Sequence, residues 1–196
     1  VCLGIGSFRG VIAGAPDVND VDISPLGYAT FLYDDQGTQM RQLSAPTSNR
    51  LPVSLDQIPV SLQHAVVAIE DERFYEHNGI DVRGIARAGM KAITTGNFSE
   101  GASTITQQLA KTLYPRADVS SRIPGFSKVK MVWIKLKEWI TAVKLERDYT
   151  KDEILDMYLN AVFFGSSAYG VRAAAQTFFA KEPADLTVEE SATLVG

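Results

Sequence analysis

The sequence predicts a mainly α-helical domain, and three observations support this fold class. Apolar residues recur at helical spacings of three and four from about residue 59 onwards. Ser/Thr–x–x–Glu/Gln patterns in the same region are typical of helix starts. Strand-like sequence is confined to one short segment, residues 28–43. The 196 residues, 45% hydrophobic and 21% charged, suffice for one compact domain with its own core.

The segment before the helical region has two parts. Residues 1–14 are mostly apolar with one charge, Arg9, and they are too few to span a bilayer by themselves. We therefore expect either a short core helix or the outer end of a transmembrane anchor. Residues 15–49 are predicted to be a linker and a β-hairpin, in which YATFLY and TQMRQL form the strands around the turn DDQG.

The apolar pattern predicts the first two helices. The spacing of Leu62 and Val66 indicates an amphipathic helix that ends near Phe74. The next helix is capped by Asp81 and closed by Gly96. Its inward face is expected to consist of Val82, Ile85, Ala86, Met90 and Ile93.

Capping boxes and a second set of apolar residues predict the other helices. The boxes are Thr104 with Gln107, Thr150 with Glu153, and Thr187 with Glu190. The first of these helices runs through Tyr114, and residues 115–127 then break the pattern, which predicts a mobile loop. Two apolar faces mark further helices: Val129, Val132, Trp133, Leu136, Ile140 and Val143 after the loop, and Val171, Ala174, Ala175 and Phe178 later.

Composition excludes several function classes. The net charge of −4 argues against a nucleic-acid binder. A single cysteine, Cys2, excludes an internal disulfide framework and a Cys-rich metal site. The HExxH pattern is absent, and neither histidine has a partner at metal-ligand spacing, so no metal site is predicted.

The segment EDERFYEHNG, residues 70–79, holds the first candidate for chemistry. Glu70 follows the apolar run AVVAI, and a helical turn would place it beside Val66 and Phe74. A carboxylate bordered by apolar side chains loses hydration, which raises its pKa toward the range of a useful base. The alternative interpretation is a solvated acidic cluster at a helix end.

Two further segments combine polar side chains at helical spacing. In EGASTITQQLAK, residues 100–111, Ser103, Gln107 and Lys111 would share one helix face, which suits phosphate oxygens or sugar hydroxyls. The alternative is a well-capped polar helix. In IKLKE, Lys135 and Glu138 lie one turn apart, which is also the spacing of an ordinary exposed ion pair.

A basic stripe of Arg83, Arg87 and Lys91 lies opposite the predicted apolar face of the second helix. Such a stripe is either a solvated face or a surface for acidic lipid headgroups.

The order and spacing of five segments resemble the motif series of family 51 glycosyltransferases. These are the glycosyltransferase domains of class A penicillin-binding proteins and their monofunctional relatives. The resemblance covers the chain from about residue 50 to its last residue, and the upstream linker and hairpin are also similar. The segments are EDERFYEHNG (70–79), GASTITQQLAK (101–111), KLKE (135–138), KDEILDMYLN (151–160) and YGVRAAAQTFF (169–179).

The resemblance implies a lysozyme-like fold with a smaller lobe on the membrane. It also implies an inverting reaction on lipid II, in which the 4-hydroxyl of the acceptor GlcNAc attacks the anomeric carbon of the growing chain and undecaprenyl diphosphate leaves. A sugar hydroxyl needs a general base, and a diphosphate leaves readily once cations hold its charge. An inverting enzyme needs no carboxylate nucleophile.

The resemblance also assigns roles to residues. Glu70 matches the general base, and Glu138 matches a second catalytic acid that orients the diphosphate-binding groups or the donor sugar. Arg73, Lys111 and Lys135, aided by Ser103, match the residues that hold the diphosphate. Positions that shape the substrate cleft are Asp71, His77, Thr104, Gln107 and Gln108. Tyr158 and Asn160 match the fourth motif, where we expect a structural role.

The sequence departs from the family pattern at two positions. Ile134 stands where the third motif usually has Arg, so that either Lys128 or Lys130 substitutes for the missing cation or the diphosphate is held less tightly. Ala180 stands where the last motif usually has Gly; we expect this change to matter little.

The expected setting is the outer face of the cell membrane, with a single-pass anchor. Expected partners are lipid II, the growing glycan strand, the membrane and other cell-wall synthesis proteins, but no nucleic acid. No cofactor is required by the sequence, although a divalent cation such as Mg²⁺ could accompany the lipid diphosphate. The alternatives are a lysozyme-like glycan hydrolase, which would need no cluster of cations, and an inactive membrane-anchored scaffold, against which Glu70 and Glu138 argue.

Overall fold

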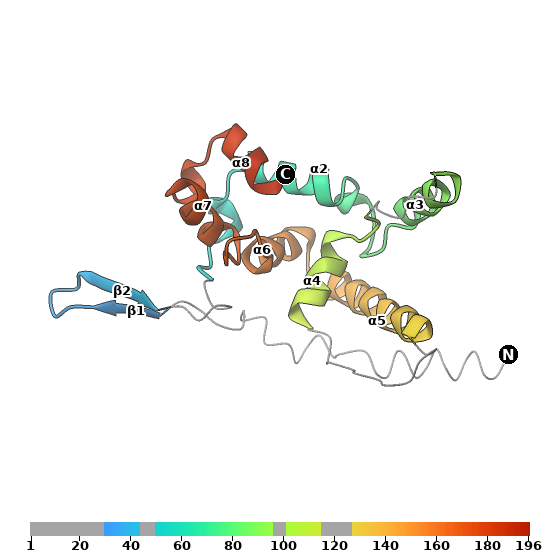
Figure 1. Cartoon of the computed structure of the whole chain (residues 1–196), viewed down its shortest axis with the longest axis horizontal. Coiled ribbons are helices and arrows are strands. Elements are labelled where there is room, and N and C mark those ends of the chain that lie inside the picture. The colour runs from blue at the N-terminus through green and yellow to red at the C-terminus, as the bar shows by residue number, and fades with distance from the viewer. Residues whose placement is uncertain (1–29, 44–49, 96–100, 115–126) are drawn as a thin grey trace. The chain divides into compact units, whose positions relative to one another are not determined.

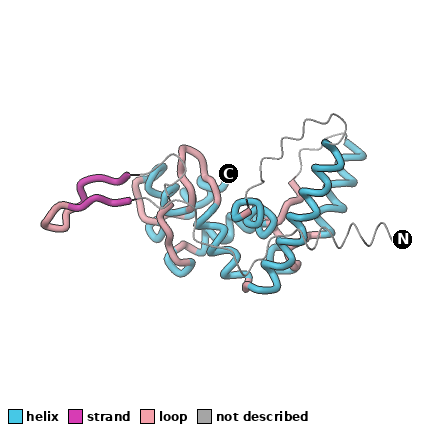
Figure 2. The backbone as a smooth tube through the Cα atoms, turned by 90° about the horizontal axis from the view of Figure 1, so that it is seen from below, coloured by secondary structure: helices cyan, strands magenta, loops and turns pink. Residues whose placement is uncertain are grey.

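The computed structural model describes residues 30–43, 50–95, 101–114 and 127–196, and most of these residues are helical (Figures 1 and 2). The predicted mainly α class is therefore confirmed. The predicted anchor end at residues 1–14 and the predicted loop up to residue 126 lie outside the described residues. None of the helices in the described ranges is both long and apolar enough to cross a membrane.

The chain divides into two compact units, which are described here one at a time. Within the described residues, the α4–α5 unit comprises Arg73–Ile154 and the α2–α8 unit comprises residues 30–72 together with Leu155–Gly196.

The α2–α8 unit is built on a helix pair. Its elements are β1 (Thr30–Tyr33), β2 (Gln39–Leu43), the 3₁₀ helix η2 (Leu55–Gln57), α2 (Val60–Glu70), the end of α6 (Lys151–Ala161), α7 (Val171–Phe179), the 3₁₀ helix η4 (Pro183–Asp185) and α8 (Val188–Val195). Helix α2 packs along α8 (Figure 1), and Leu62 and Val66 of α2 are buried. Strands β1 and β2 pair antiparallel, within the segment where a hairpin is expected.

Local signals explain how this unit's helices begin and end. The predicted capping box of Thr187 and Glu190 is present at the start of α8. Helix α7 begins after Gly170, where an added Cβ would lie 2.6 Å from the carbonyl oxygen of Asn160. The same helix ends at Ala180, whose φ of 54° lies in the left-handed region that favours glycine. The departure at Ala180 therefore coincides with a strained backbone position.

One side chain fixes the entry of the chain into the helical part of this unit. The Oδ1 atom of Asn160 accepts a hydrogen bond from the Val53 N–H at 2.9 Å, and its Nδ2 donates to the Val53 carbonyl at 2.8 Å. The same Nδ2 also donates to the carbonyl of Asp156 on α6. These bonds support the structural role expected for Asn160.

The described residues of the α4–α5 unit form helices and loops, and none of them lies in a strand. Its elements are the 3₁₀ helix η3 (Phe74–Glu76), α3 (Val82–Thr95), α4 (Ile105–Leu113), α5 (Ser127–Asp148) and the first turn of α6. Helix α4 packs across α5 (Figure 1), where Ala110 and Leu145 meet in a buried cluster. The predicted cap of α3 is confirmed, because the Asp81 carboxylate accepts the Gly84 N–H. The predicted box of Thr150 and Glu153 is also present before α6.

Two predictions about these helices are wrong. Helix α2 ends at Glu70 instead of near Phe74, since Asp71 takes an extended backbone conformation (φ −160°) and Phe74 starts the separate helix η3. The predicted inward face of α3 is largely exposed: Val82 is 71%, Met90 69% and Ile93 86% exposed. Periodicity shows which residues share a helix face, but it does not show what covers that face.

Candidate active site

Glu70 lies in the α2–α8 unit as the last residue of α2, and it is half-buried. It lines a pocket of about 270 Å³ together with Val66, Tyr158 and Phe163, among other residues. Burial, and then the nearby negative charge of Glu70, raise the pKa of Tyr158, so the phenol stays protonated at neutral pH. The carboxylate therefore borders apolar side chains and one hydroxyl that can donate a hydrogen bond.

Asp71, the next residue, is buried and caps the C-terminal end of α2. Its backbone N–H donates to the Val67 carbonyl at 3.0 Å.

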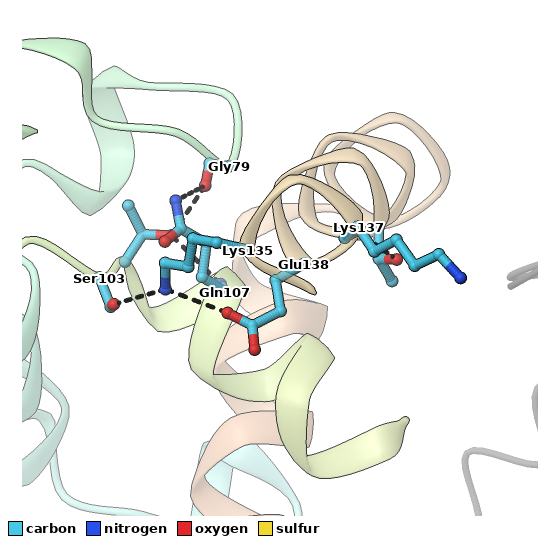
Figure 3. Close-up of polar contacts among 8 residues, drawn as sticks. Gly79, Ser103, Gln107, Lys135, Lys137 and Glu138 are labelled. Atoms are coloured by element: carbon cyan, nitrogen blue, oxygen red, sulfur yellow. Dashed lines mark hydrogen bonds and ion pairs between the residues drawn. The ribbon is translucent and has the colours of Figure 1, made fainter. Parts of the chain in front are cut away.

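In the α4–α5 unit, Lys135 joins two of the other candidate residues. Its Nζ donates to the Ser103 Oγ at 3.1 Å and to the Glu138 Oε2 at 3.1 Å. Figure 3 shows the ammonium between the hydroxyl and the carboxylate, with Lys137 directed away from them. Glu138 is buried, whereas the Lys135 side chain remains 41% exposed. The carboxylate thus holds a cation that a ligand can still reach.

Thr104 and Gln107 meet at the carbonyl of Gly79. The Thr104 hydroxyl donates to this carbonyl at 2.8 Å and accepts the Gln107 N–H at 3.1 Å, so Thr104 is the N-cap of α4 as predicted. The second half of the predicted capping box is not formed, because the Gln107 Nε2 donates to the Gly79 carbonyl at 3.2 Å (Figure 3). The buried Gln107 Oε1 has no hydrogen-bond partner within the described residues.

Glycine is the only residue type that fits at position 79. Its φ is +83°, and an added Cβ would lie 2.8 Å from the carbonyl carbon and oxygen of Ala142 on α5. The loop therefore lies directly against α5. This contact was not predicted from the sequence, although the Asn78–Gly79 pair is a recognisable turn signal.

Arg73 belongs to an ion pair in this structure. Its Nη2 contacts both carboxylate oxygens of Asp81. Burial opposes ionisation of Asp81, but the hydrogen bonds from Arg73 and the Gly84 N–H lower the pKa of this carboxyl below its usual value. Arg73 therefore supports the N-terminus of α3 whatever else it binds.

The remaining candidates occupy separate positions in the α4–α5 unit. Lys111 is exposed in the last turn of α4, and Gln108 is half-buried. The expected shared face of Ser103, Gln107 and Lys111 is not formed, because Ser103 precedes the helix and the Gln107 side chain is buried. His77 is half-buried, and its carbonyl accepts a hydrogen bond from Lys151.

The departure at Ile134 lies on α5 next to Lys135, and the Ile134 side chain is half-buried. The side chains of Lys128 and Lys130 lie outside the described residues, so their substitution for the missing arginine stays a prediction. Among the residues that the structure describes, no group of three or more His, Cys, Asp or Glu side chains could hold a metal ion.

The α2–α8 unit thus carries a half-buried carboxylate, and the α4–α5 unit carries a partly exposed lysine that a buried glutamate and a serine hold. Carboxylates and positioned cations of this kind are side chains that group-transfer enzymes use. A family profile described as Transglycosylase matches residues 36–196. The chain therefore belongs to the transglycosylase family, the glycosyltransferase family 51 domain.

Three relatives illustrate the similarity. Penicillin-binding protein 1F of Bacillus subtilis is 45% identical over 163 residues, 83% of this chain and 21% of the relative. Penicillin-binding protein 1A of Escherichia coli is 40% identical over 100% of this chain and 22% of the relative. Penicillin-binding protein 1A of Clostridium perfringens is 41% identical over 95% of this chain and 26% of the relative. The chain thus spans about a fifth to a quarter of the length of these relatives.

Proposed function

We propose that the chain polymerises lipid II into glycan strands by an inverting transfer that releases undecaprenyl diphosphate. The observation that carries the proposal is the Lys135 ammonium, which Glu138 and Ser103 hold while it stays accessible. A leaving diphosphate needs such a cation. Membership of the transglycosylase family supports the same reaction.

The proposed general base is Glu70. The 4-hydroxyl of the acceptor GlcNAc transfers its proton to the Glu70 carboxylate while the hydroxyl oxygen bonds to the anomeric carbon. The bond from that carbon to the lipid diphosphate breaks, and the diphosphate keeps the electron pair. The pocket of about 270 Å³ that Glu70 lines supports this role, because an acceptor hydroxyl can reach the carboxylate there.

Lys135, Lys111 and Ser103 are the residues proposed to stabilise the negative charge of the leaving diphosphate. Glu138 orients Lys135. Arg73 takes part only if its guanidinium can bind phosphate oxygens while it remains paired with Asp81. The remaining candidates shape the cleft in this proposal. They are Asp71, His77, Thr104, Gln107 and Gln108; of these, Thr104 and Gln107 act by fixing the Gly79 carbonyl.

Helix α3 is the proposed membrane-facing part of a smaller lobe in a lysozyme-like fold. Its exposed apolar residues are Val82, Met90 and Ile93. The exposed Arg83, Arg87 and Lys91 lie on the flank adjacent to this stripe and not opposite it, because each follows an apolar position by one residue. An apolar stripe with a basic flank suits a helix in the interface of a bilayer that contains anionic lipids. The proposed location is the outer face of the cell membrane, with a single-pass anchor and other cell-wall synthesis proteins as partners.

A divalent cation such as Mg²⁺ remains part of the proposal. Magnesium prefers oxygen ligands and is commonly bound by phosphates with one or two carboxylates. Near Lys135, the structure offers the buried Glu138 carboxylate, which already accepts from Lys135. The diphosphate oxygens would therefore bind most of such an ion.

Incubation of the chain with fluorescent lipid II in detergent or vesicles tests the proposed function. Polymer of increasing length, sensitive to digestion by lysozyme, is the expected product. Absence of polymer, together with cleavage of preformed glycan, would favour the hydrolase instead. Absence of both activities would favour the inactive scaffold.

A further inference from the structure

Lys151, the first residue of α6, makes three separate contacts inside the α4–α5 unit. Its Nζ donates to the His77 carbonyl at 2.7 Å and to the Glu146 Oε1 at 2.7 Å. The same ammonium lies 4.4 Å from the centre of the Phe74 ring, a cation–π distance. The Lys151 side chain is only 20% exposed and that of Glu146 4%. This is a largely buried ion pair, separate from the group around Lys135.

Glu146 extends the contact to a further helix. Its Oε1 also accepts the Thr106 hydroxyl from α4 at 2.5 Å. Four elements, η3, α4, α5 and α6, therefore meet through Lys151 and Glu146. A buried ion pair of this kind often adds no stability over an apolar pair of similar volume. Its presence is better explained by the geometry that it imposes.

Lys151 helps to fix the backbone of the segment Phe74–Gly79, which side chains from outside the segment hold at two points. Lys151 binds the carbonyl of His77 and covers the ring of Phe74, while Thr104 and Gln107 bind the carbonyl of Gly79. In the sequence, this segment follows Glu70, Asp71 and Arg73 within a few residues. The segment's backbone conformation therefore depends on side chains from α4 and α6.

We propose that Lys151 is a positioning residue for glycosyl transfer. It touches no reacting atom, and it acts by fixing the backbone of Phe74–Gly79. The inference rests on the proposed function, since it requires a polymerisation rate to be measured. A displacement of about 1 Å in a catalytic segment can reduce turnover roughly 100-fold.

The test compares three variants with the unchanged chain. Lys151→Met alone leaves the buried Glu146 carboxylate without its cation and is at risk of misfolding. The main variant is therefore the double change Lys151→Met with Glu146→Gln, which removes both charges and keeps an acceptor for Thr106. Lys151→Arg keeps the charge and the donors. Lys181→Met is the matched control, because Lys181 forms a similar 2.7 Å ion pair with Glu190 in the α2–α8 unit.

For each variant, kcat and KM are measured with fluorescent lipid II well below the melting temperature, and hydrogen exchange is followed at the amides of residues 74–79. The double variant is expected to lose roughly 10- to 100-fold in kcat with little change in KM, and to exchange these amides faster while α5 stays protected. Lys151→Arg should restore most of the turnover, and Lys181→Met should resemble the unchanged chain.

Two results would overturn the inference. One is a folded double variant that turns over at the original kcat. The other is unchanged exchange at residues 74–79 in the folded double variant, a readout that needs no substrate. Failure of the proposed function is distinguishable from both, because the unchanged chain would then produce no polymer.

Discussion

The Thr104 hydroxyl donates to the carbonyl of Gly79 at 2.8 Å, and this bond between residues 25 positions apart joins two sequence motifs. The bond depends on the close approach of Gly79 to α5, where no Cβ fits. Thr104 in turn caps α4 and directly follows Ser103, which binds Lys135. The geometry around Lys135 is therefore linked to the backbone of the loop that ends at Gly79.

Gly79→Ala should destabilise the fold strongly. A left-handed backbone costs a non-glycine residue roughly 1–2 kcal/mol, and the forced contact with Ala142 adds about 1–3 kcal/mol. The matched control is Gly165→Ala, which has φ +94° but no neighbour closer than 3.8 Å. Urea unfolding of both variants checks the expectation. If Gly79→Ala and Gly165→Ala lost equal free energy of unfolding, the backbone at residue 79 would not lie tightly against α5.

Glu70→Gln should abolish polymerisation while the fold persists. Loss of a general base typically costs a factor of about 100 to 10,000 in rate. Glu76→Gln, an exposed change a few residues later in the sequence, serves as the control and should retain activity. Polymer from the Glu70 variant at nearly the original rate would remove Glu70 from its assigned role.

Lys135→Ala should reduce kcat by roughly 100- to 1,000-fold, because the developing charge on the diphosphate loses a positioned donor. Lys111→Ala should also slow turnover sharply. Lys137→Ala is the control, since its side chain is directed away from Ser103 and Glu138 (Figure 3). If Lys135 and Lys111 can both be removed without loss of rate, the diphosphate site is assigned to the wrong residues.

Ala180→Gly should stabilise the chain. The change removes roughly 1–2 kcal/mol of left-handed strain, of which about 0.5–1 kcal/mol is offset by the greater freedom of glycine in the unfolded state. Ala192→Gly, within the exposed face of α8, should have the opposite sign because no strain is relieved there. Thermal melting of both variants provides the comparison. A lower melting temperature for Ala180→Gly would contradict the strain at this position.

Ile134→Arg tests the departure in the third motif. If the missing cation weakens the hold on the diphosphate, the added arginine should raise activity or affinity by up to roughly 1.5–3 kcal/mol. If Lys128 or Lys130 already fills the role, the arginine should do nothing and alanine at the compensating lysine should be costly. Initial rates across a range of lipid II concentrations distinguish these outcomes. Neutral behaviour of all three variants would mean that no cation is needed here.

Local features of the structure follow closely from the sequence. The caps at Asp81, Thr150 and Thr187 are present, because each depends on residues three positions apart. The helices α4 to α8 occupy the predicted segments, because apolar spacing and caps are also local patterns. The exposed face of α3 could not be foreseen, since the spacing of Met90 and Ile93 is the same on a buried helix and on an exposed one.

The site depends more on contacts between distant parts of the chain. Ser103 and Lys135 are 32 residues apart, and Lys151 and the His77 carbonyl are 74 residues apart. No periodicity links such pairs. Ser103, Lys135 and Glu138 were expected as a group only through the family resemblance. Gln107 fits the capping-box pattern, yet it donates to Gly79 because the close approach of the loop supplies a carbonyl there.

The amide of Asn160 satisfies both backbone groups of Val53, much as a neighbouring strand would. For protein engineering, the helical body therefore starts at Val53 and not at Val60, where the first α-helix begins. In a fragment that begins at Val60, the Asn160 amide would keep only its bond to Asp156. Its two bonds to the Val53 backbone would be replaced by bonds to water. A shortened version of the domain should keep Val53 together with Asn160, as should any chimera joined upstream of α2.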